Sequence, residues 1–218
     1  VYSSSFERAE RKTKDYNKAV MENKHLRATV QLDGSIKIYD KENERNVFSD
    51  RGNILMFYKD VPSYWDAWDI AVEYEKCGEK IKADTVRKVE NSEKREMIEV
   101  LYSHQGTRIV QKYVLWDNTP RIDILTEIHC HSRRSMIKAV FPFNLLTRRA
   151  KYDLGAGYIE RSTTRNDDYE RARFEVPGHR WVDISEPNYG IVVLNNGKYG
   201  HSCDGSTYSL TLLRSPIF

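Results

Sequence analysis

Apolar and polar residues alternate along much of the chain from residue 20 onward. In KHLRATVQLDGSIKIYD, residues 24–40, the alternation continues on both sides of Asp33-Gly34, and this dipeptide between alternating segments is a strong hairpin signal. The same period of two recurs downstream in KADTVRKVEN, REMIEVLYSH, TRIVQKYVLWD and RIDILTEIHCHS. A period of two places successive side chains on opposite faces of a strand. The pattern therefore predicts antiparallel strands joined by short turns.

Other stretches are more continuously apolar and predict buried strands, among them NILMFYKD, MIKAVFPFNL and YGIVVLNN. The proline in the second of these predicts a bent or edge strand. Residues 1–19 are polar and show no apolar face, so we expect a linker or a frayed helix there. Residues 20–218 contain about a dozen predicted strands and no convincing helix. Regular meandering strands of this kind favour one all-β domain, a large antiparallel β-sandwich.

The charge pattern narrows the range of partners. The 218 residues include 35 Lys or Arg and 32 Asp or Glu, a net charge of +3. Positive and negative residues are interleaved, so the chain lacks the basic block that a nucleic-acid partner would require. No apolar run reaches the roughly 20 residues of a membrane span, and no signal-peptide pattern opens the chain. We expect a cytoplasmic protein without a membrane or nucleic-acid partner.

The three cysteines, Cys77, Cys130 and Cys203, lie far apart in the sequence. Their odd number argues against a disulfide framework and fits a reducing compartment, and their spacing gives no zinc motif. We therefore expect no cofactor in this chain. The chain starts at Val1 and stops as an apolar strand finishes, which indicates a fragment of a longer protein.

The stretch SYWDAWD, residues 63–69, is the best candidate for sugar binding. Flat aromatic rings stack on the C–H face of a sugar, and planar polar groups bind its hydroxyls. Trp65 and Trp68 would supply the rings, with Asp66 and Asp69 as hydroxyl acceptors. The alternative is a loop held by buried tryptophans, with the acids closing turns. A catalytic pair formed by Asp66 and Asp69 alone is disfavoured, since residues three apart on a strand face opposite ways.

The histidines give weaker signals. His129 and His131 are two residues apart, so they share one face of a strand and could bind a metal. No third ligand is evident, and any half-polar strand face has this spacing. His179, next to Arg180, fits either a structural ion pair with Asp183 or Glu186 or a docking surface.

Several strings together resemble the C-terminal β region of the α-mannosidases of glycoside hydrolase family 38. They are DGSIKIYDKENERNVFSDRGN, YWDAWDI, IERSTTRNDDYERARFEVPGHRWVDISEPNYGIVVLNNGKYGHS and SLTLLRSP, and they run in the family's order from about Asn23 to Pro216. The resemblance implies the β-sandwich portion, a supersandwich of the galactose-mutarotase type, of a cytosolic, bacterial or archaeal retaining exo-α-mannosidase. It also implies what is missing. In the family an N-terminal barrel holds a divalent metal, usually zinc, and supplies both catalytic carboxylates.

The resemblance implies roles for residues in this chain. An aromatic residue near position 68 reaches the mannose site in the family, and an arginine from a late strand approaches the substrate. We therefore expect Trp65, Asp66, Trp68, Asp69 and Arg214 to bind an α-mannoside, with no catalytic residue in this chain. For Arg214 the alternative is a structural ion pair. Asn196 stands where the family commonly has aspartate. The amide keeps the hydrogen bonding of the turn but loses the charge, so the role of that acid is either structural or weakened here.

Three functions remain open from the sequence. The first is a non-catalytic part of an α-mannosidase that completes the sugar pocket and supports the catalytic barrel. The second is a free-standing carbohydrate-binding module. The third is a mutarotase-like enzyme, which would need His129, His131 or His179 close to a carboxylate. The first predicts an exposed apolar patch larger than the few hundred Å² typical of monomers, with self-association into a homo-oligomer.

Overall fold

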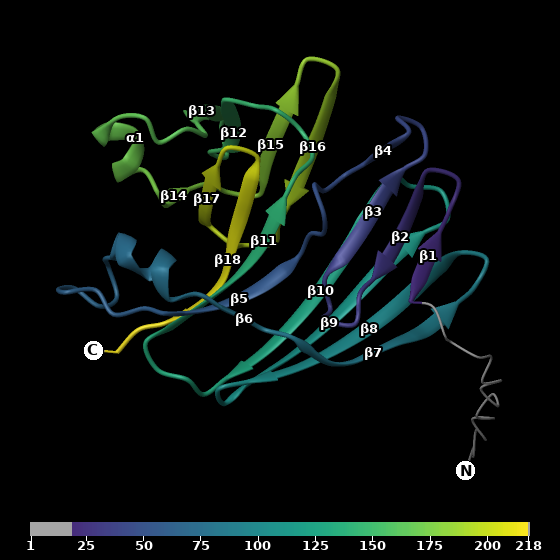
Figure 1. The fold of residues 1–218 in the computed structure, drawn as a ribbon, viewed down its shortest axis with the longest axis horizontal. Helices are drawn as coiled ribbons and strands as arrows, with labels where there is room; N and C mark the ends of the chain where they lie inside the picture. The colour runs from purple at the N-terminus through teal and green to yellow at the C-terminus, as the bar shows by residue number, and fades with distance from the viewer. Residues whose placement is uncertain (1–18, 218) are drawn as a thin grey trace, which may run out of the picture.

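In a computed structural model, residues 19–217 form eighteen strands, the 3-10 helix η1 (Val72–Cys77) and the helix α1 (Asp168–Ala172) (Figure 1). Every pairing between these strands is antiparallel. The expectation of an all-β fold is therefore confirmed. The predicted linker or frayed helix falls almost entirely outside the described residues and stays a prediction.

Two of the four sheets are meanders in which consecutive strands pair. The first has the order β1-β2-β3-β4 and consists of β1 (Val20–Glu22), β2 (Leu26–Val30), β3 (Ile36–Asp40) and β4 (Arg45–Asn46). The second has the order β10-β9-β8-β7 and consists of β7 (Ala83–Asn91), β8 (Arg95–His104), β9 (Thr107–Trp116) and β10 (Ile122–Cys130). Both follow the alternating stretches and turn residues of the sequence.

The other two sheets join distant parts of the chain. The six-stranded sheet has the order β14-β17-β18-β11-β5-β6, with β14 (Val176–Pro177), β17 (Gly200–Asp204), β18 (Thr207–Ser215), β11 (Ser135–Pro142), β5 (Ile54–Lys59) and β6 (Glu79–Lys80). The last sheet has the order β13-β12-β15-β16, with β12 (Arg149–Asp153), β13 (Tyr158–Ser162), β15 (Trp181–Glu186) and β16 (Tyr189–Leu194).

The four sheets are arranged as a propeller-like ring of small sheets, so the expected large antiparallel β-sandwich of the supersandwich type is wrong. Alternation along a strand indicates which side is buried, but it does not identify the strand's partners. In the six-stranded sheet β11 lies between β5 and β18, and no local turn signal encodes either neighbour. The local strands could be predicted, but their division among four sheets could not.

One hydrophobic cluster connects the sheets. It includes Met21 from the first sheet, Tyr113 from the second, Ile137 from the six-stranded sheet and Val182 from the last, each at 0 % exposure. Burial of apolar surface at about 25 cal/mol per Å² is the main stabilising contribution to such a core. The core therefore holds the described residues together as one unit.

The tip of the predicted hairpin at Asp33-Gly34 lies where the first two sheets meet. The hydroxyls of Tyr113 and Tyr102 donate to the carbonyl of Gly34 at 2.7 and 3.2 Å. Gly34 has φ +86°, and a Cβ there would lie 2.3 Å from the Tyr102 hydroxyl. Both the conformation and the space require glycine.

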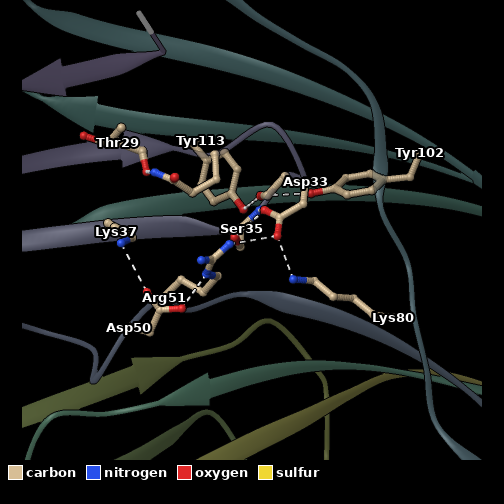
Figure 2. Close-up of polar contacts among 11 residues, drawn as sticks. Thr29, Asp33, Ser35, Lys37, Asp50, Arg51, Lys80, Tyr102 and Tyr113 are labelled. Atoms are coloured by element: carbon tan, nitrogen blue, oxygen red, sulfur yellow. Dashed lines mark hydrogen bonds and ion pairs between the residues drawn. The ribbon is translucent and has the colours of Figure 1, made fainter.

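Asp33 connects this hairpin to β6 (Figure 2). Its Oδ2 accepts from Lys80 Nζ at 2.6 Å and from Arg51 at 3.1 Å. Burial raises the pKa of this carboxyl, but the hydrogen bonds from Lys80 and Ser35 outweigh that effect and hold the pKa well below its usual value. The ionised carboxylate of Asp33 therefore links the first sheet to the six-stranded sheet.

Candidate functional site

The residues predicted to bind sugar gather around one loop. This loop, residues 61–71 and called the tryptophan loop below, connects β5 to η1. Trp65 has φ +57°, and its carbonyl accepts from the amides of Trp68 at 2.7 Å and Asp69 at 2.9 Å. The turn leaves the Trp65 and Trp68 side chains 77 % and 88 % exposed. A left-handed backbone is costly for a bulky aromatic residue, and such strain gathers at binding sites.

Arg214, near the end of β18, holds this loop in place. Its Nε donates to Asp60 Oδ2 at 2.7 Å, and its Nη2 donates to the carbonyls of Asp69 at 2.6 Å and Asp66 at 3.3 Å. Asp60, directly after β5, is only 1 % exposed. The planar fork of an arginine suits several acceptors at once. In this structure Arg214 acts through the loop backbone, and its direct contact with a sugar stays a prediction.

The two predicted acids of the loop have different surroundings. Asp66 is directed inward: its Oδ2 accepts from the amide of Ile217 at 2.7 Å, and its Oδ1 lies 3.4 Å from Arg134 Nε. Asp69 is exposed, and its Oδ1 accepts from the amide of Ile70 at 2.9 Å. Asp66 therefore supports the loop and the end of the chain, and Asp69 is the carboxylate available beside the tryptophans.

A buried charged cluster anchors η1, which directly follows the loop. Lys138, in the middle of β11, is 1 % exposed and forms an ion pair with Glu175. Lys138 Nζ also lies 3.3 Å from the hydroxyl of Tyr74 in η1, and that hydroxyl donates to Glu175. Arg165 also donates two hydrogen bonds to the carboxylate of Glu75, at 2.8 and 2.9 Å. These contacts join η1 to the segment around α1.

Burial changes the protonation equilibria in this cluster. It lowers the pKa of Lys138, an effect that the neighbouring carboxylate of Glu175 opposes. It raises the pKa of Tyr74, and the negative charge of Glu175 adds to the shift. An ionised carboxylate paired with a buried ammonium needs excellent geometry to offset its desolvation. The cluster therefore depends on the close approach of η1, β11 and Glu175.

The groups that the site exposes are of the types that bind sugars. It presents two exposed indoles, the exposed ring of Tyr64 and one free carboxylate on a loop fixed at both ends. Rings of this kind stack on apolar sugar faces, and the carboxylate accepts from hydroxyls. The arrangement is that of a contact surface.

The histidine candidates do not join this site. His129 is exposed and its Nε2 contacts Glu127 at 2.7 Å, and His131 is exposed beside it. Among residues 19–217, no three His, Cys, Asp or Glu side chains form a group that could hold a metal. The same part of the chain has no helix long and apolar enough to cross a membrane. His129 does have a carboxylate neighbour in Glu127, as the mutarotase-like alternative would need, and that alternative stays a prediction.

The ion pairs expected for the segment around His179 are different in the structure. Glu186 pairs with Arg45 at 2.7 Å, and Asp183 lies 3.7 Å from Lys151. The His179 ring packs edge-on against Tyr199 at 5.5 Å between centroids, and its carbonyl accepts from Asn195 at 2.7 Å. The expected ion pair of His179 or Arg180 with either acid is therefore wrong. Gly197 has φ +78° in the turn that holds Asn196.

Sequence reasoning missed Asp60, Lys138 and Glu175, the charged residues that fix the loop and η1. One signal was present for Lys138. It is the single charge in the apolar run MIKAVFPF, where a strand buried on both faces leaves a lysine no route to solvent. Asp60 and Glu175 carry no comparable signal, because their partners are distant in the sequence.

Comparison with known proteins places the chain in a family. Residues 21–218 match the family described as "Glycosyl hydrolases family 38 C-terminal domain". The chain is 35 % identical to human "Alpha-mannosidase 2C1" over 168 residues, which is 76 % of this chain and 16 % of that protein. It is 31 % identical to "Alpha-mannosidase G" of Dictyostelium discoideum over 206 residues, which is 90 % of this chain and 19 % of that protein. The chain thus spans less than a fifth of the length of these relatives.

A solved structure shares the fold. It is described as "The crystal structure of an alpha-mannosidase from Enterococcus faecalis V583", and it matches with a TM-score of 0.80 at 14 % identity. The match covers 93 % of this chain and 26 % of that one. The family match spans nearly all of the chain, and the resemblance seen in the sequence motifs is confirmed. The chain belongs to glycosyl hydrolases family 38 and corresponds to the C-terminal domain of that family.

Proposed function

We propose that this chain is the non-catalytic β portion of a retaining α-mannosidase and that its tryptophan loop completes the sugar pocket of the catalytic domain. The observation that carries the proposal is the loop itself, which Arg214 and Asp60 fix while Trp65 and Trp68 stay largely exposed. A rigid, solvent-facing pair of indoles loses little conformational entropy when it binds. The catalytic carboxylates and a divalent metal, which we expect to be zinc, belong in this proposal to the rest of the protein.

An apolar surface beside the loop supports a docking role. Val72 and Phe174 line a hollow of about 490 Å³ between η1 and α1, and Tyr169 on α1 is 80 % exposed. An exposed patch of this kind marks an interaction site. Because the chain spans less than a fifth of its relatives' length, we propose the catalytic domain of the same protein as the occupant. Without that domain the patch should lead to self-association, which sedimentation velocity would detect.

Reconstitution tests the proposal. The chain alone should not hydrolyse a chromogenic α-mannoside, and the protein that includes the upstream catalytic domain should. In that protein Trp68→Ala should lower kcat/KM by about tenfold or more, the loss expected for one stacking aromatic. Tyr158→Ala is the matched control, since it removes an exposed ring on β13, outside both the loop and the proposed docking surface. Metal-dependent turnover by the chain alone would overturn the proposal.

A free-standing carbohydrate-binding module is the second candidate, and the exposure of Trp65 and Trp68 favours it as well. Calorimetric titration of the chain with mannose and short α-mannosides distinguishes the two. Binding at low millimolar sugar that Trp68→Ala abolishes would support the module. The absence of heat under those conditions is the result we expect, because the loop supplies only one side of the pocket.

A further inference from the structure

A second hollow lies at the end of the β7–β10 sheet, and no residue of the tryptophan loop lines it. It has a volume of about 610 Å³, and its lining includes Ser103, Arg108, His129 and His131 around the β8–β9 turn. The turn residues Gln105 and Gly106 both have positive φ, 43° and 74°, as a two-residue hairpin of this type requires. Nothing in the proposed α-mannosidase function uses this hollow.

Strand register brings three polar side chains together there. Ser103 lies opposite Arg108, and Arg108 lies opposite His129. Residues directly opposite each other project from the same face of a sheet, with Cβ atoms about 5 Å apart. The amide of His131 donates to the carbonyl of Gly106 at 3.3 Å and fixes His131 beside the same turn. Four hydrogen-bond donors therefore line one small concave surface.

The two acids near the hollow pair with residues other than Arg108. Glu127 contacts His129 Nε2 at 2.7 Å. Glu79 contacts Gln105 Nε2 at 2.9 Å and lies 3.4 Å from His104 Nε2.

Within residues 19–217, the Arg108 guanidinium and the His131 imidazole make no ion pair, and neither acid reaches them. The guanidinium fork matches the oxygens of a phosphate or carboxylate.

The residues that line the hollow favour an anion over a metal cation or a neutral sugar. Arg108 in the middle of the row repels a metal cation. His104 also lines the hollow, but its ring packs edge-on against Phe57 at 5.0 Å between centroids. No Trp, Tyr or Phe lines the hollow, so it lacks the stacking surface of a neutral-sugar site. An oxyanion is the ligand that an arginine, histidines and a serine hydroxyl bind in common.

We propose that this hollow binds a phosphate group, held by Arg108, His129, His131 and the Ser103 hydroxyl. Inorganic phosphate and a sugar phosphate share this chemistry, and the volume of the hollow accommodates either. Because all four side chains are exposed, binding should be weak, with Kd in the millimolar range for inorganic phosphate.

The test is a titration of the chain with inorganic phosphate, mannose 6-phosphate and mannose, followed by amide shifts in NMR spectra. Arg108→Gln should weaken phosphate binding about fivefold or more, and Glu127→Gln should tighten it because a competing carboxylate is removed. Arg121→Gln is the matched control, since it removes the same charge next to the opposite end of β10. A lower Kd for mannose 6-phosphate than for inorganic phosphate would identify a sugar phosphate as the preferred ligand.

Three results would overturn the proposal. One is the absence of saturable shifts around residues 103–108 with either phosphate. Another is equal weakening by Arg121→Gln, which would indicate only a general effect of net charge. The third is binding of mannose as tight as that of mannose 6-phosphate. Thermal unfolding of each variant verifies that the exposed substitutions leave the fold intact.

Discussion

Replacement of Arg214 by methionine tests whether the tryptophan loop is held by a buried ion pair. Methionine keeps the apolar stem but removes the guanidinium that contacts Asp60, Asp66 and Asp69. The carboxylate of Asp60, at 1 % exposure, would then lose its cation, and its Oδ1 already lacks a hydrogen-bond partner.

Removing one partner of a buried pair costs about 3–5 kcal/mol. The Arg214 side chain is 19 % exposed, so we expect a loss near the lower limit, about 3 kcal/mol.

Urea unfolding of the wild type, Arg214→Met, Asp60→Asn and the double variant measures this coupling. The double variant should lose less than the sum of the two single losses, by about 2 kcal/mol, because the neutral amide no longer needs a cation. Arg87→Met is the control: that arginine is 59 % exposed in its pair with Glu99, and its loss should be below about 1 kcal/mol.

Limited chymotrypsin digestion reports on the loop itself. Arg214→Met should be cleaved faster than the wild type after Tyr64, Trp65 or Trp68, since the loop carbonyls lose their donor. A stability loss below 1 kcal/mol, or strict additivity in the double variant, would refute the reasoning.

Three further predictions concern the core that supports the site. Gly34→Ala should destabilise the fold by about 2 kcal/mol or more in urea unfolding, because φ +86° and the Tyr102 hydroxyl oppose a Cβ; Gly197→Ala, with positive φ but open space, should cost less. Lys138→Met should cost about 3 kcal/mol by leaving Glu175 unpaired, and adding Glu175→Gln should recover part of that loss; no recovery would argue against the pair. Burial lowers the pKa of His201 to about 4, below the 6.5 of an unfolded histidine, so stability is lost as the pH falls from 6.5 toward 4, by about 2.5 kcal/mol at pH 4.5. The drop in urea stability from pH 7.5 to 4.5 should therefore be smaller by that amount in His201→Gln, and equal drops would contradict the assignment.

The sequence patterns predicted features that depend on local chemistry. Asp33-Gly34 lies in a hairpin turn as expected, and the alternating stretches are strands. The tryptophan loop was also recognised, because Trp65, Asp66, Trp68 and Asp69 are neighbours in the sequence. Local residue types are sufficient for such features, since the physical cause lies within a few residues.

Features that depend on distant partners could not be predicted. The division of strands among four sheets depends on neighbours such as β5, β11 and β18, which no turn connects. The placement of Arg214 against Asp60 joins residues 154 positions apart, so the sequence suggested a sugar contact or a structural ion pair for Arg214 but could not identify Asp60 as the partner. The inward orientation of Asp66 has the same origin, because its partners Arg134 and Ile217 belong to other segments.

Steady-state kinetics of the protein with its catalytic domain tests the central claim most directly. The claim is that the clamped tryptophan loop contributes to the sugar pocket of an α-mannosidase. We predict that Trp65→Ala and Trp68→Ala each lower kcat/KM for an α-mannoside by about tenfold or more, with Tyr158→Ala close to wild type. Wild-type kcat/KM in both loop variants, with the fold intact, would contradict the claim.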